Sequence, residues 1–103
     1  MNAPLYNENA RFDERKIVAD SLFFKTMGIE VLSGNPVKDL QQPNVIFLSD
    51  RFAGRIFGGE NPVGKTVNYN HEKDFTVKGT YEALPENATV HPEAVISMPT
   101  LWN

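Results

Sequence analysis

The clearest periodic signal in the chain is a strict alternation between residues 74 and 81. Every second position there is apolar or small: Phe75, Val77, Gly79 and Tyr81. A period of two is typical of a β-strand with one buried face, so we expect these four residues to face one side of a sheet. A shorter run, Thr66–Tyr69, precedes this strand, and the four residues Asn70–Lys73 between them suit a hairpin loop.

A continuous apolar run, Val45–Leu48, predicts a strand that is buried on both faces. Ser49 follows it and is a suitable cap for a helix, because a serine hydroxyl can accept a bond from a free N–H group of the first turn. The apolar positions of that helix lie at i, i+1, i+4 and i+5: Phe52, Ala53, Ile56 and Phe57. We expect Gly58 and Gly59 to end it.

The N-terminal third of the chain gives a weaker pattern. Residues 1–10 have no period and are interpreted as a loose lead-in, and the run Arg11–Ala19 predicts a strand. Asp20 then stands where a helix cap is expected, and Gly28 can close the short helix in the left-handed conformation. One side of that helix should carry Leu22, Phe23, Phe24 and Met27. Ile29–Ser33 predicts a short strand after it.

The C-terminal third predicts a turn at Leu84–Asn87 and a last strand at Glu93–Ser97. Pro99 could begin a further helix, but the sequence ends four residues later, at Asn103. We therefore expect the sequence to be a piece of a longer protein. Together the pattern predicts an α+β fold, a mixed sheet of about five to six strands with two short helices packed on it. Residues 1–15 would form the lead-in and the start of the first strand, and residues 16–103 one domain. Seven aromatic residues fall at inward positions and are interpreted as core: Phe23, Phe24, Phe47, Phe52, Phe57, Phe75 and Tyr81.

Composition excludes several classes of protein. Ten basic residues against thirteen acidic ones give a net charge of −3, and no basic cluster is present, so we expect no nucleic-acid partner. The longest apolar run is far short of the ~20 residues that span a bilayer. No basic stretch leads into an apolar segment at the N-terminus, so no signal peptide is expected. Because the chain has no cysteine, it can form neither a disulfide nor a thiolate metal site.

The segment Gly59–Thr66 matches the phosphate-binding pattern G-x-x-x-x-G-K-[ST]. A working phosphate loop follows a strand and opens a helix, so that free N–H groups converge on the phosphates. Here a helix pattern leads into the segment and a strand pattern leaves it. We therefore interpret it as a structural turn, and Asp50 upstream as a charge that complements the dipole of its helix rather than as a magnesium ligand.

The remaining candidates for chemistry are isolated residues. His71 and His91 lack partners at metal-ligand spacing and are interpreted as loop residues. None of the serines Ser33, Ser49 and Ser97 lies in a nucleophile elbow, and the adjacent acids Asp13 and Glu14 would point to opposite faces of a strand. Asn87-Ala88-Thr89 forms a glycosylation triplet of a kind that arises often by chance. We therefore predict no catalytic, cofactor-binding or metal-binding residue and no cofactor.

An ordered series of these segments resembles the extracytoplasmic core domain of MacB-like (FtsX-like) ABC transporter permeases. The series comprises the paired aromatics Phe23-Phe24 leading through Gly28-Ile29 to Gly34, the strand Val45–Ser49 followed by Ala53, Phe57 and Gly58, the motif N-P-V-G-K-x-V at Asn61–Val67, and F-x-V-x-G at Phe75–Gly79. It runs from about Lys16 to Trp102. In that family the N-P-V-G-K segment is a turn between helix and strand.

The resemblance implies a non-catalytic domain inserted between the first two transmembrane helices of an inner-membrane permease, on the periplasmic (extracytoplasmic) side. ATP hydrolysis would occur on a separate nucleotide-binding domain or subunit and would be coupled to export or to periplasmic partners. The implied partners are the permease's own membrane helices, the ATPase, a second copy and a periplasmic adaptor. Two other classes stay open from the residues alone: a stand-alone small-molecule or peptide-binding module, and the nucleotide-binding enzyme disfavoured above.

Overall fold

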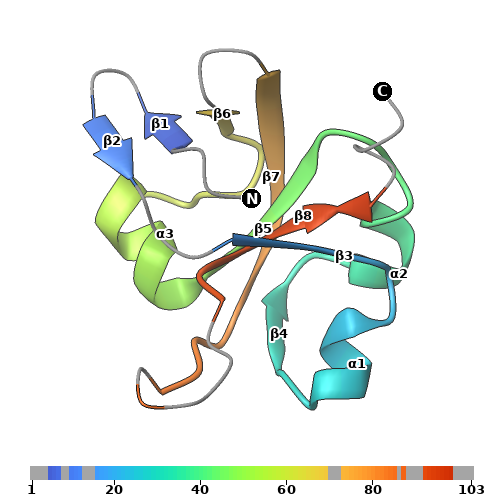
Figure 1. Cartoon of the computed structure of the whole chain (residues 1–103). Helices are drawn as coiled ribbons and strands as arrows, with labels where there is room; N and C mark the ends of the chain where they lie inside the picture. Colours follow the sequence, from blue (N-terminus) through green and yellow to red (C-terminus); the bar gives the residue numbers. More distant parts are fainter. Residues whose placement is uncertain are drawn as a thin grey trace.

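The computed structural model describes residues 5–7, 10–12, 16–69, 73–85, 87 and 92–98. Within them lie eight strands and three short helices (Figure 1). In chain order they are β1 (Leu5–Asn7), β2 (Ala10–Phe12), β3 (Lys16–Ala19), α1 (Phe23–Met27), β4 (Val31–Ser33), α2 (Pro36–Asp39), β5 (Val45–Ser49), α3 (Asp50–Phe57), β6 (Thr66–Tyr69), β7 (Lys73–Tyr81) and β8 (Ala94–Ser97). The described helices include none long and apolar enough to cross a bilayer.

The strands form one mixed sheet in the order β2-β1-β6-β7-β5-β8-β3. β5 runs parallel to β7 and β3 runs parallel to β8, whereas the other pairs are antiparallel. β6 pairs with the first half of β7, and β4 pairs with its last two residues. The predicted α+β class, with a mixed sheet and short helices packed on it, is confirmed.

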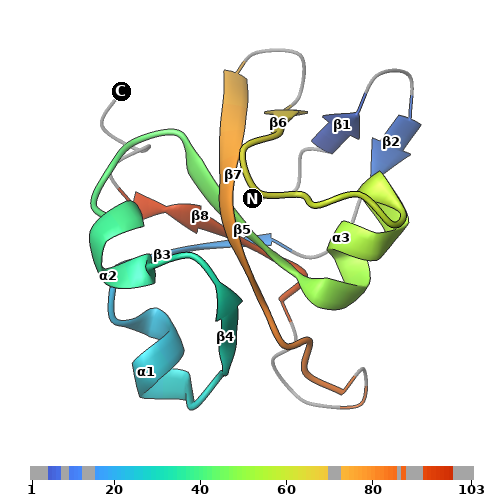
Figure 2. The same ribbon diagram turned by 180° about the vertical axis from the view of Figure 1, so that it is seen from behind.

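The core consists of two clusters. One contains the buried face of α3, with Phe52 and Phe57, together with side chains of β5, β6 and β7. The other contains Phe24 of α1, together with Phe47 and Tyr81. α3 and the pair α1–α2 accordingly lie on opposite sides of the crossing strands β5 and β7 (Figures 1 and 2). The prediction that β5 is buried on both faces is confirmed, because all five of its residues are buried.

The alternation along β7 is confirmed for burial, but the prediction that its four inward residues share one face is wrong. Ile46 pairs with Val77, whereas the next residue, Phe47, pairs with Gly79, so Lys78 is an extra residue. An extra residue in one strand is a β-bulge, and it reverses the facing of every side chain beyond it. Val77 therefore joins the α3 cluster and Tyr81 the α1 cluster.

The N-terminal predictions need two corrections. Leu5–Asn7 is not a loose lead-in but a strand, because β1 pairs with both β2 and β6 and Leu5 is fully buried. The predicted strand Arg11–Ala19 is found as β2 and β3, with residues 13–15 outside the described part. Sequence periodicity could not reveal β1, since a three-residue strand is shorter than the pattern that identifies one.

The first helix is also shorter than its pattern suggests. Asp20 caps the turn before α1 rather than α1 itself: its carboxylate accepts from the Leu22 N–H at 3.0 Å, and the helix begins at Phe23. Phe24 is buried as predicted, but Leu22 and Met27 are exposed. Gly28 closes the helix with φ 70°, as predicted.

Helix α2 has no apolar pattern and was not predicted. Pro36 stands in its first turn, and the side chain of Asn35 accepts from the Lys38 N–H, so its signal is a cap followed by proline. The predicted helix at Pro99 lies outside the described residues.

Candidate functional site

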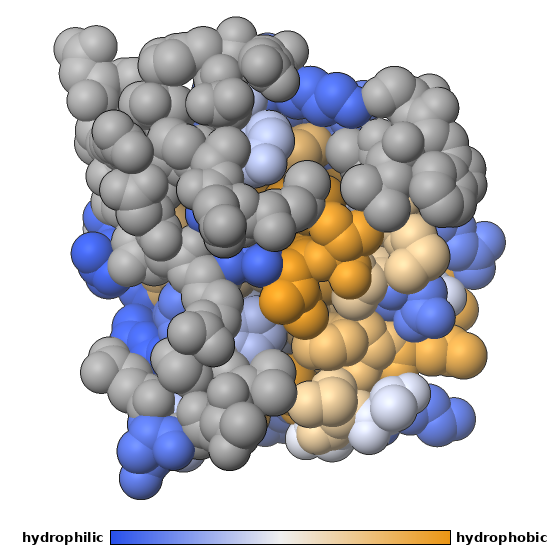
Figure 3. All heavy atoms as spheres, viewed as in Figure 1, coloured by the Kyte–Doolittle hydropathy of each residue, from blue (hydrophilic) through white to orange (hydrophobic). Residues whose placement is uncertain are grey.

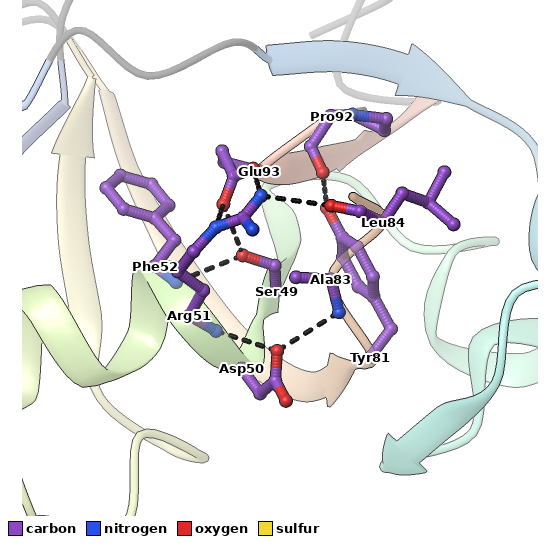
Figure 4. A network of polar contacts seen from close by, with 9 residues as sticks. All are labelled: Ser49, Asp50, Arg51, Phe52, Tyr81, Ala83, Leu84, Pro92 and Glu93. Atoms are coloured by element: carbon purple, nitrogen blue, oxygen red, sulfur yellow. Dashed lines mark hydrogen bonds and ion pairs between the residues drawn. The ribbon is translucent and has the colours of Figure 1, made fainter. Parts of the chain in front are cut away.

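The most developed polar arrangement lies where three central strands meet at one end of the sheet. β5 ends at Ser49, β7 ends at Tyr81, and Glu93 immediately precedes β8. Because β5 is parallel to β7 and antiparallel to β8, these three positions lie at the same end (Figure 4). We call the group formed by Ser49, Asp50, Arg51, Tyr81 and Glu93 the polar junction.

Ser49 links the helix to the sheet. Its hydroxyl accepts from the Phe52 N–H at 3.0 Å, which confirms the predicted cap of α3, and it donates to Oε1 of Glu93 at 2.8 Å. Its own N–H donates to the Glu93 carbonyl at 2.9 Å. Since the hydroxyl proton is directed to a carboxylate that is itself paired, Ser49 is arranged as a connector and not as a nucleophile.

Arg51 and Glu93 form the charged centre of the junction. The Arg51 guanidinium donates from Nε to Oε1 of Glu93 at 3.2 Å and from Nη2 to Oε2, so the pair is bidentate. Nη2 also donates to the Leu84 carbonyl at 3.2 Å. The side chain of Glu93 is 11% exposed and that of Arg51 34%, so the carboxylate is buried and the guanidinium covers it from the solvent side. A carboxylate neutralised in this way is poorly suited to act as a general base.

Two further contacts tie the segment between β7 and β8 to the junction. Oδ1 of Asp50 accepts from the N–H groups of Arg51, at 2.8 Å, and of Ala83, at 3.0 Å. At the other end of that segment, the Tyr81 hydroxyl donates to the Pro92 carbonyl at 2.8 Å. Burial raises the pKa of the Tyr81 phenol far above its ordinary value, and the nearby Glu93 carboxylate raises it further, while Arg51 opposes them.

The junction therefore holds both ends of the segment 82–93 against the first turn of α3. The Arg51 guanidinium bonds to both ends of this segment: to the Leu84 carbonyl at one end and to the Glu93 carboxylate at the other. No local pattern predicts the pairing of Arg51 with Glu93, because these two residues are 42 positions apart and neither belongs to a motif. The interpretation of Asp50 as a first-turn charge is confirmed, although its bond to Ala83 could not be foreseen.

The segment that matches the phosphate-binding pattern forms a turn between α3 and β6. The Gly64 N–H donates to the Val77 carbonyl at 2.7 Å, and the Lys65 N–H to the Pro62 carbonyl at 3.1 Å. The Lys65 ammonium lies 3.8 Å from Oε1 of Glu60 and 5.9 Å from the centre of the Phe57 ring. These two N–H groups are engaged within the protein, in the helix–turn–strand order that the sequence predicts.

Among the described residues, Ser33 and Ser97 each have a partner outside the polar junction. Ser33 bonds to Thr80 at 2.9 Å, and Ser97 accepts from the Val45 N–H at 3.3 Å. His71, His91, Asp13 and Glu14 lie outside the described residues, as do Ala88 and Thr89 of the glycosylation triplet. In the part of the chain that the structure describes, no three His, Cys, Asp or Glu side chains are grouped as a metal ion would require.

Comparison with known proteins gives one family. The model described as the MacB-like periplasmic core domain matches residues 3–103. No curated protein matches the chain.

Three solved structures share the fold. A domain of a permease protein from Porphyromonas gingivalis superposes with a TM-score of 0.79 at 19% identity, over 98% of this chain and 46% of that one. The periplasmic region of MacB from Actinobacillus actinomycetemcomitans gives 0.74 at 22% identity, over 96% and 45%. The extracellular domain of the ABC-type transporter YknZ from Gram-positive bacteria gives 0.73 at 17% identity, over 96% and 51%. The chain thus spans about half the length of the solved structures that it matches.

Proposed function

Because the chain belongs to the family of MacB-like periplasmic core domains, we propose that it couples ATP hydrolysis on a cytoplasmic ATPase domain or subunit to movement outside the membrane. In this proposal the parent protein is an ABC transporter permease of the inner membrane, and the 103 residues stand on its periplasmic side. The movement serves export or acts on a periplasmic adaptor. The family match over residues 3–103 is the observation that carries the proposal.

The polar junction supports a mechanical role over a catalytic one. Its serine, carboxylates and guanidinium bond to one another or to nearby backbone groups, so their geometry serves to connect α3, β5, β7 and β8. An enzyme needs a nucleophile or base directed at a substrate, and these groups are directed at each other. A domain that transmits displacement needs rigid connections of this kind between its elements.

The test uses the intact permease together with its ATPase, reconstituted in liposomes. The 103 residues contain no cysteine, so a single Val63→Cys change on the exposed turn after α3 provides a unique label within them. We expect the distance between spin labels on two copies of the permease to change between the nucleotide-free and ATP-bound states. With an ATPase variant that binds but does not hydrolyse ATP, the distance should stay at the value of the ATP-bound state.

Two outcomes would contradict the proposal. One is a distance that is the same in every nucleotide state. The other is full transport after the domain is locked by a cross-link. Saturable binding of a small ligand or peptide by the 103 residues alone, with no dependence on the membrane helices, would instead favour a stand-alone binding module.

A further inference from the structure

Strand β3 lies at one end of the sheet and has a neighbour on one side. Among the described residues it pairs with β8 alone. A strand paired on one side leaves about half of its N–H and C=O groups directed away from the sheet. Natural edge strands usually carry an exposed charge, a proline or a bulge that discourages further pairing. β3 has neither a proline nor a bulge, and its single charged residue, Lys16, is 6% exposed; its protection is limited to its short length and this buried charge.

The surface next to this edge is apolar. Ile17 and Val18 of β3 are half-buried, and α1 follows directly in the chain. Leu22, at the start of α1, is 53% exposed, and Met27, at its end, is 43% exposed. Figure 3 shows apolar surface gathered over β3 and between β3 and α1. Single exposed apolar residues are ordinary, but a weakly protected strand edge beside exposed leucine and methionine is an arrangement that proteins normally cover.

We propose that β3 and the outer side of α1 are covered by an extended segment of the same polypeptide, from the part of the permease's extracytoplasmic region that lies outside these 103 residues. This inference rests on the proposed function, in which the chain is part of a longer permease. The three solved structures align with 96–98% of this chain, yet the aligned part is only 45–51% of each of them. Each therefore contains about as many further residues, and these need a surface to pack on.

The chemistry of the edge defines what the segment must offer. It supplies backbone N–H and C=O groups to extend the sheet beyond β3, and apolar side chains at alternate positions to cover Leu22 and Met27. A second copy of this chain, an adaptor protein or the membrane surface would cover the same residues by other means. The experiment has to separate these occupants.

The test compares two single-cysteine variants of the intact permease, after replacement of any other accessible cysteine. Leu22→Cys lies on the proposed surface, and Val63→Cys, on the turn after α3, is the matched control, with 38% exposure of the native side chain. In the purified permease we expect a maleimide to modify the cysteine at position 22 at least about tenfold more slowly than the one at position 63, because covered groups react only after local opening. Both should react at the same rate in denaturant.

Equal rates in the folded permease would overturn the inference. Protection that disappears when the permease is diluted to monomers would assign the surface to a second copy. Protection present in cells but lost on purification would assign it to another protein or to lipid, and either result overturns the inference. A separate measurement tests the proposed function, which places the domain outside the inner membrane. If that placement is wrong, an impermeant maleimide will modify neither cysteine in intact cells that lack the outer membrane, but will modify both after lysis.

Discussion

Gly79→Ala is expected to be among the most damaging small substitutions in this chain. A Cβ added at Gly79 would stand 2.2 Å from the Ser33 carbonyl oxygen and 2.6 Å from the Phe47 ring. Both neighbours are fixed, since Ser33 belongs to β4, which pairs with β7 at this point, and Phe47 is fully buried. Gly79 does not have positive φ, so the cost is steric and not conformational.

The magnitude follows from the rigidity of the contacts. Overpacking a core by one methyl group costs typically about 1–3 kcal/mol. We expect a value near the upper end, about 3 kcal/mol, because one of the two contacts is with a backbone atom that can yield only if β4 separates from β7. For a domain of this size, each 1 kcal/mol lowers the melting temperature by about 4–8 °C. The variant should therefore melt about 12–24 °C below the native chain.

Gly54→Ala is the matched control. Gly54 lies in α3, and a Cβ there would meet no atom within 4 Å beyond the neighbouring backbone of its own helix. The same chemical change should stabilise the protein by up to about 1 kcal/mol, because alanine is a better helix former than glycine. The assay is urea unfolding of both variants followed by circular dichroism. If the free energy of unfolding of Gly79→Ala lies within about 0.5 kcal/mol of that of the native chain, this result would refute the close approach of β4 to the bulge of β7.

Four further substitutions test the core, the turn and the junction. Phe57→Ala should cost about 3–5 kcal/mol in urea unfolding, because it empties a buried site under α3, and a cost below 1 kcal/mol would mean that the buried face of α3 is wrongly assigned. Lys65→Ala should cost at most about 1 kcal/mol, since its ion pair and its ring contact are both partly exposed, and a larger loss would refute a surface role for this turn. Glu93→Gln should cost about 1.5–3 kcal/mol, because the amide cannot accept both bonds from Arg51, and an unchanged unfolding midpoint would show that the pair does not hold the junction. The pKa of Tyr81 is raised in the folded state, so the unfolded chain ionises first as the pH rises. The contribution of the neutral Tyr81 to the free energy of unfolding should therefore be fully present below pH 10.0 and be lost above it. Tyr81→Phe should remove part of this alkaline loss of stability, and an identical profile for the variant would contradict the prediction.

The elements that sequence predicts well are those whose signal is local. Ser49 and the apolar positions of α3 lie within one nine-residue window, and the cap and the buried face are both found as expected. The same holds for β5, whose continuous apolar run directly reflects burial on both faces. In each case the residues that determine the structure are also neighbours in the chain.

The features that sequence does not predict depend on distant partners. The bulge at Lys78 is defined by the register of β7 against β5, and Tyr81 reaches the α1 cluster only because of it. Gly79 could have been read as a sign of a bulge, since glycine inside a strand pattern often marks one or a close backbone approach. The pairing of Arg51 with Glu93 had no such sign.

The location of the polar junction bears on how a domain of this fold could transmit force. The two core clusters contact opposite sides of β5 and are apolar. Directional bonds are concentrated at Ser49, Arg51 and Glu93, where the ends of the central strands meet the first turn of α3. A displacement of Ala83–Leu84 or Pro92–Glu93 would therefore act on α3 through these bonds. By contrast, α1 packs on the sheet through the buried Phe24 in its apolar cluster. If the domain deforms during a transport cycle, the physical expectation is that α3, Ala83–Leu84 and Pro92–Glu93 move together and that the β3–α1 side adjusts.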